Sequence, residues 1–81
     1  MDMERIRARG EYEELKLEAE RLKMAGEDAR ESLADAIAIF HPLEAIDLAR
    51  VTYLSAQLLE STAKLKEVLS TMKRIQGRYG L

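Results

Sequence analysis

The chain has 81 residues, of which 47% are hydrophobic and 35% are charged, with a net charge of −2 and no cysteine. A chain of this length forms at most one small domain and buries too little apolar surface for a large core of its own. Because disulfides and thiolate metal sites are excluded without cysteine, we expect self-association to supply the missing burial.

A seven-residue apolar repeat predicts a first long helix over about residues 3–40. Apolar or small residues recur there at alternating spacings of three and four, which places them in one narrow stripe, the seam of a coiled coil. The stripe comprises Tyr12, Leu15, Ala19, Leu22, Gly26, Ala29, Leu33, Ala36 and Phe40. Pro42 disfavours the helical conformation at His41, so we expect this helix to end near Phe40.

We expect residues 41–47 to form a linker, although Pro42 could instead cap the second helix directly, and Asp47 is the alternative N-cap. The second helix is predicted over about residues 48–76 and ends at Gly77, with basic residues close to its C-terminus. Its stripe comprises Val51, Leu54, Leu58, Ser61, Leu65, Val68, Met72, Ile75 and Tyr79.

The two stripes predict an all-α fold, a single antiparallel two-helix coiled-coil hairpin. With the longer linker, Gly26 lies opposite Ser61, so the gap in one stripe meets the polar residue of the other. A tight turn at His41 and Pro42 would shift the partners by about four residues and lose this match. Charge supports the pairing, because residues 1–40 carry a net −4 and residues 48–81 a net +4.

The linker end of this hairpin carries more large apolar residues than two stripes can use. They are Ile37, Ile39, Leu43, Ile46, Leu48, Tyr53 and Leu59. A large exposed apolar patch normally marks an interface, so we expect these residues to join two hairpins into a dimeric four-helix bundle. Two alternatives stay open: a linker that folds back could bury them locally, and the partner could be a different protein.

Basic residues converge at the other end of the hairpin and are candidate phosphate contacts. They are Arg5, Arg7, Arg9, Lys73, Arg74 and Arg78. Glutamates are interspersed among them and the net charge of the chain is negative, which favours a solvated, charge-paired surface over a nucleic-acid site.

No catalytic motif can be assembled from these residues: there is no Ser-His-acid set and no Gly-rich phosphate loop. We therefore expect no enzyme activity, no cofactor, no metal and no small-molecule substrate. His41, the one histidine, is expected to have a turn or capping role, with Asp35 and Glu44 as neighbours. The apolar runs are far shorter than the ~20 residues that span a bilayer, and no signal peptide is evident, so a cytoplasmic location is expected.

Two segments carry a resemblance to a known group of proteins: Arg7–Leu17, with the sequence RARGEYEELKL, and Phe40–Glu44, with the sequence FHPLE. Together with the second amphipathic helix they resemble the small helical accessory proteins of Mu-like prophages. The resemblance covers the whole two-helix plan. It implies a cytoplasmic protein of bacterial or phage origin and assigns no site residues.

Overall fold

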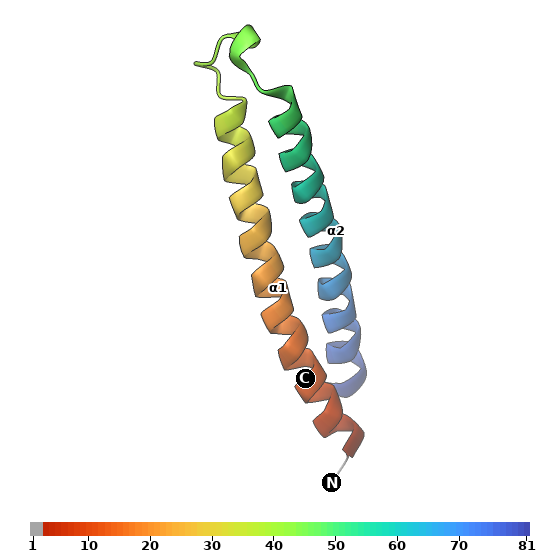
Figure 1. The fold of residues 1–81 in the computed structure, drawn as a ribbon. Helices are drawn as coiled ribbons and strands as arrows, with labels where there is room; N and C mark the ends of the chain where they lie inside the picture. The colour runs from red at the N-terminus through yellow and green to blue at the C-terminus, as the bar shows by residue number, and fades with distance from the viewer. Residues whose placement is uncertain (1–2) are drawn as a thin grey trace.

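The computed structural model describes residues 3–81 and shows two long helices folded back on each other (Figure 1). Helix α1 spans Met3–Ala36, the short 3-10 helix η1 spans Leu43–Ala45, and helix α2 spans Leu48–Tyr79. The described chain measures 65 × 16 × 14 Å, which is a rod two helices wide. The predicted all-helical hairpin is confirmed. We call the turn between the helices the loop end and the opposite end the open end.

The core is a thin seam between α1 and α2. Within residues 3–81, its buried side chains are Ala8, Ala19, Leu22, Ala29, Leu54 and Ile75. All other members of the two predicted stripes except Phe40 are half-buried. Two helices cover each seam side chain from one side only, so most of these residues keep contact with solvent.

The register of the two helices can be read at Gly26. A Cβ atom placed on Gly26 would lie 3.7 Å from Cβ of Ser61, at ordinary van der Waals distance. Near the open end, Ala8 and Tyr79 line the same shallow groove. Both pairs agree with the register predicted for the longer linker. Because the register is known at two points, the residue of α2 that lies at the same height along the rod as a given residue of α1 can be found by counting.

The prediction that the first helix reaches residue 40 is wrong, because α1 ends at Ala36. The backbone N–H of Ala38 donates to the carbonyl of Asp35 at 3.3 Å, a tighter turn than the α-helical pattern. Nε2 of His41 lies 3.0 Å from the same carbonyl oxygen and donates to it. These bonds satisfy a carbonyl at the end of α1 and turn the chain before Pro42 is reached.

Phe40 is consequently not a seam residue, which corrects its assignment to the first stripe. Its side chain is 73% exposed, and its ring lies against the ring of His41 with the centroids 4.5 Å apart. The connection between the two long helices covers residues 37–47 instead of 41–47.

The start of α2 is set by Asp47. The Oδ1 atom of Asp47 accepts a hydrogen bond from the backbone N–H of Arg50 at 3.1 Å, which satisfies one donor of the first turn. Pro42 instead precedes η1, where its fixed φ of −66° suits the extended backbone. Of the two N-caps that the sequence offered, the structure therefore uses Asp47.

The end of α2 also differs from the prediction, because the helix continues through Gly77 to Tyr79. Gly80 ends it with a φ of 67°, a left-handed conformation that favours glycine. The backbone N–H groups of Gly80 and Leu81 both donate to the carbonyl of Gln76, at 2.9 and 3.2 Å. The extra turn brings Tyr79 beside α1 at the open end.

Candidate functional site

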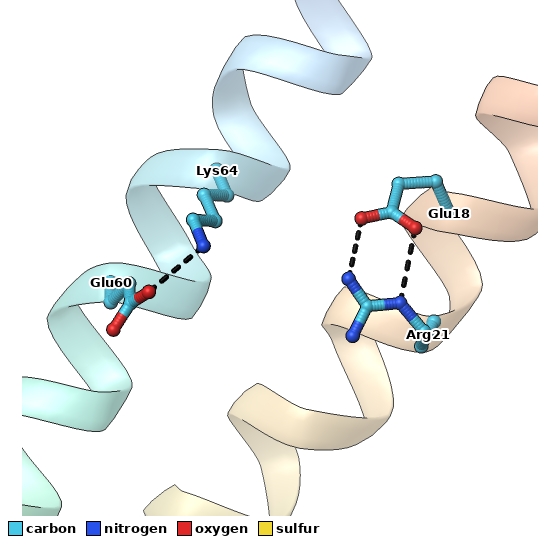
Figure 2. A network of polar contacts seen from close by, with 4 residues as sticks. All are labelled: Glu18, Arg21, Glu60 and Lys64. Carbon is cyan, nitrogen blue, oxygen red and sulfur yellow. Dashed lines mark hydrogen bonds and ion pairs between the residues drawn. The ribbon is translucent and has the colours of Figure 1, made fainter.

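One long side of the hairpin, here called the salt-bridge face, holds ion pairs formed within each helix (Figure 2). On α1, Arg21 donates to both carboxylate oxygens of Glu18, at 3.0 and 2.5 Å. On α2, Nζ of Lys64 donates to Glu60 at 2.8 Å. Between the two helices lies an open groove of about 210 Å³, which is lined by Arg21, Glu60 and Lys64 together with Leu22, Ala25, Gln57 and Ser61.

The carboxylates of the salt-bridge face are stabilised in their charged form by these neighbours. The hydrogen bond from Arg21 lowers the pKa of Glu18 below its ordinary value of 4.5, and the charge of Lys64 on the other helix lowers it further. The hydrogen bond from Lys64 likewise lowers the pKa of Glu60. Glu18 and Glu60 thus both find a cation within one chain.

The opposite side of the hairpin is here called the leucine face. Residues that directly precede a seam residue, such as Glu18 and Lys64, lie on the salt-bridge face. By helical periodicity, residues that directly follow a seam residue, such as Lys16 and Leu69, lie on the opposite side. The leucine face of α2 contains Leu48, Thr52, Ser55, Leu59, Thr62, Lys66, Leu69 and Lys73, all of them exposed.

Charges on the leucine face are arranged differently on the two helices. The face of α1 alternates cations and anions: Arg9, Glu13, Lys16, Glu20, Lys23, Glu27 and Arg30. Glu27 and Arg30 form an ion pair with each other. The remaining acids Glu13 and Glu20, and Lys66 and Lys73 of α2, form no ion pair with any residue of 3–81. The face of α2 carries cations and no acid.

The predicted dimer-interface residues lie at and near the loop end. Six of the seven are exposed, and Ile46 is half-buried. Ile37 and Leu59 each follow a seam residue, and Leu48 lies at the top of the same face. Tyr53 lies on the salt-bridge face instead, where its hydroxyl accepts a hydrogen bond from Gln57 at 2.8 Å. Three of the seven residues, Ile37, Leu48 and Leu59, therefore lie on the leucine face.

The six candidate phosphate contacts are all exposed at the open end. The guanidinium of Arg78 lies 5.5 Å from the ring centroid of its neighbour Tyr79. Arg7 lines a shallow groove of about 190 Å³ together with Ala8, Tyr79 and two acids, Glu4 and Glu11. The cations are thus brought to one end, but carboxylates lie among them.

The sequence analysis missed several residues of these surfaces. Leu69 of the leucine face and the outer residues Leu17 and Met24 of α1 are exposed and were assigned no role. Leu48, Ser55, Thr62 and Leu69 recur every seven residues, parallel to the seam. This second repeat could have identified the leucine face from the sequence. It is hard to recognise because two of its four members, Ser55 and Thr62, are polar.

Within residues 3–81, no three metal-ligating side chains gather at one place. In the same part of the chain, neither long helix has the length and apolar content needed to cross a bilayer. Comparison of the chain with protein-family models, with curated proteins and with solved structures gives no match.

Proposed function

We propose that this protein is a non-catalytic interaction module that associates with a second copy of itself through helical surface, forming a four-helix bundle. The observation that carries this proposal is the exposed apolar loop end, where Ile39, Phe40 and Leu43 all face solvent. Three neighbouring large side chains at one tip form the kind of patch that proteins normally cover with a partner.

The surface area of the chain supports the same conclusion. It exposes 6514 Å². A globular monomer of 9.2 kDa is expected to expose about 4,900 Å². The excess of roughly 1,600 Å² per chain matches what each partner contributes to an obligate homodimer interface. A second hairpin is large enough to cover it.

The balance of apolar side chains points the same way. Within residues 3–81, twelve large hydrophobic side chains are exposed, whereas the buried core holds six residues, three of which are alanines. Burial of apolar surface is the main favourable term in folding. A hairpin that leaves more large apolar groups outside its core than inside gains stability by associating.

We further propose that the module is an accessory protein of a prophage and acts in the cytoplasm, as the resemblance implies. Both long helices present side chains to solvent along their whole length, which suits a protein that works by contacting other helices. Partners other than a second copy are then expected to bind the same exposed surfaces.

The proposal is tested by thermal unfolding over a range of protein concentrations. If folding and association are coupled, the midpoint of unfolding rises with concentration. The double variant Ile39→Ser/Leu43→Ser should lower the midpoint and weaken its concentration dependence. Leu17→Ser is the matched control, because Leu17 is 68% exposed but lies on the outer side of α1, away from the loop end. A midpoint that does not vary with concentration contradicts the proposal.

A second candidate function, binding to nucleic acid, is favoured by one observation: the exposed cations of both helices meet at the open end. Binding of a duplex oligonucleotide at two salt concentrations tests it, because phosphate contacts weaken steeply as salt rises. The variant Arg7→Ala/Arg74→Ala should then bind more weakly and with a smaller salt dependence. Absence of binding at low salt excludes this function.

A further inference from the structure

We infer that the second copy docks on the leucine face with both loop ends at the same end of the bundle, so that α1 of each chain lies against α2 of the other. This inference rests on the proposed function and specifies the surface and the orientation of the two copies. It is carried by the distribution of charge over the leucine face.

Two hairpins that meet through their leucine faces can form a closed two-fold dimer in two ways. If the axis runs parallel to the helices, α1 faces α2 of the other copy and the loop ends lie together. If the axis runs across the helices, α1 faces α1, α2 faces α2, and the loop ends lie at opposite ends of a rod 65 Å long. The charges of the face distinguish these two arrangements.

A two-fold rotation about an axis parallel to the helices does not change the height of a residue along the rod. Residues of α1 and α2 that lie at the same height in one hairpin therefore also lie at the same height when they come from different copies. Counting down α1 from Gly26 and up α2 from Ser61 brings Glu20 level with Glu67, the residue next to Lys66. Since the helix rises about 1.5 Å per residue, Glu20 of one copy then faces Lys66 of the other.

The same count places Glu13 level with Arg74, and thus opposite Lys73 of the second copy. Glu13, Glu20, Lys66 and Lys73, which form no ion pair within residues 3–81, are therefore matched in two pairs, and the symmetry of the dimer repeats both. Complementary charges at an interface select the orientation of the partners and raise the rate of association.

Apolar residues are matched in this arrangement too. By the same count, Ile37 of one copy lies at a level between Leu48 and Thr52 of the other, and Lys16 lies at a level between Leu69 and Lys73. The aliphatic part of a lysine side chain can cover a leucine while its ammonium group stays in water. Lys66 and Lys73 each lie one residue from the level of an acid and two residues from the level of a lysine, Lys23 and Lys16 respectively.

We call the dimer whose axis runs across the helices the crossed arrangement. In it, the cations of α2 have no such acidic partners. The two acids of α2, Glu60 and Glu67, each precede a seam residue and so lie on the salt-bridge face. Two copies of α2 meeting through their leucine faces would bring Lys66 and Lys73 to a surface without any acid. Of the two arrangements, only the one with the loop ends together therefore gives Lys66 and Lys73 acidic partners.

A charge swap divided between two variants tests this arrangement. Glu20→Lys alone should give two lysine–lysine contacts in its homodimer, and Lys66→Glu alone should give two glutamate–glutamate contacts. Each single variant is expected to dimerise at least about tenfold more weakly than the parent. In an equimolar mixture, a heterodimer restores both attractive pairs, so the dimer should return.

Sedimentation of the parent, the two single variants and their mixture separates the outcomes. Recovery of the dimer in the mixture supports the arrangement. Weak single variants without recovery, or single variants that dimerise like the parent, overturn it. A monomeric parent instead overturns the proposed function. Glu14→Lys is the matched control, because Glu14 precedes seam residue Leu15 and makes the same charge change on the salt-bridge face.

A distance measurement provides an independent test of the orientation. The chain contains no cysteine, so Glu44→Cys introduces a single attachment point for a spin label at the exposed loop end. With the loop ends together, the two labels of a dimer lie far closer than the 65 Å length of the rod. A label separation that approaches the full length identifies the crossed arrangement and contradicts the inference.

Discussion

The two long faces of the hairpin use similar residues in different ways. On the salt-bridge face, Glu18 and Glu60 are each held by a cation one turn away on the same helix. On the leucine face, Glu20 and Lys66 form no ion pair with residues 3–81, and Leu59 between the polar side chains is 72% exposed. Both faces carry charges without an ion pair, but only the leucine face also carries a row of exposed leucines, Leu48, Leu59 and Leu69.

This difference shows that the amphipathic pattern of a two-helix rod can encode two contacts. The seam joins α1 to α2, and a weaker repeat beside it presents leucines and charges to solvent, where we propose that a second copy binds. In non-obligate protein interfaces, polar groups surround the buried apolar positions in a similar way. Substitutions in the seam, the leucine face and the salt-bridge face should therefore differ in the size of their effects.

The largest effect is expected at the seam that both faces share. Leu22 is 4% exposed, so Leu22→Asp places a carboxylate in a buried position of the seam. We expect the free energy of unfolding to fall by about 3 kcal/mol or more, measured by chemical denaturation. Leu17→Asp, on the exposed side of the same helix, should cost little. Similar losses for both variants would show that α1 does not pack through this stripe.

The next largest effect should distinguish the two faces. Leu59→Asp introduces a charge into the leucine face and is expected to weaken dimerisation by about 100-fold, because the symmetric interface contains the change twice. Tyr53→Asp, at a similarly exposed position of the salt-bridge face, should leave the dimer nearly unchanged. Analytical ultracentrifugation of both variants gives the dissociation constants. Equal effects would remove the distinction between the faces.

A smaller, opposite effect is expected where Gly26 lies opposite Ser61 at the seam. A Cβ at position 26 meets only ordinary van der Waals contact, so Gly26→Ala should raise the free energy of unfolding by about 1 kcal/mol through helix propensity. Gly80→Ala should instead destabilise the chain, because φ is positive there. Thermal unfolding measures both. Destabilisation by Gly26→Ala would mean that the helices approach more closely than this register allows.

The smallest effect is the pH dependence of the salt-bridge face. The pKa values of Glu18 and Glu60 in the folded chain lie below the ordinary 4.5, so their ion pairs stabilise the fold above that pH. This contribution is lost as the pH falls through the lowered values. Unfolding at neutral pH and at about pH 3 should show a smaller difference in Glu18→Gln/Glu60→Gln than in the parent. An unchanged difference would show that these pairs contribute nothing.

Much of the fold follows from local pattern. The three–four spacing identified both helices, and Gly26 with Ser61 gave their register, because one periodic stripe and one gap leave few alternatives. The ends were harder. Both Gly77 and Gly80 suit a helix end, and the choice depends on where Tyr79 packs, which is a tertiary contact.

The site was less accessible to sequence reasoning than the fold. The turn at Ala36 depends on the bonds of His41 and Ala38 to Asp35, which no propensity encodes. The leucine face could be identified only once Glu18 of α1 and Lys64 of α2 were seen on the same, opposite side of the hairpin. A helix offers several cations within reach of each acid, so sequence alone does not say which pairs form.

Sedimentation equilibrium of the unmodified protein is the most direct test of the central claim, that the exposed surface of a single hairpin is covered by a second copy. We predict a dimer of about 18 kDa, twice the 9.2 kDa of one chain, at micromolar concentration. A species that remains a folded 9.2 kDa monomer at about 100 µM would contradict the account.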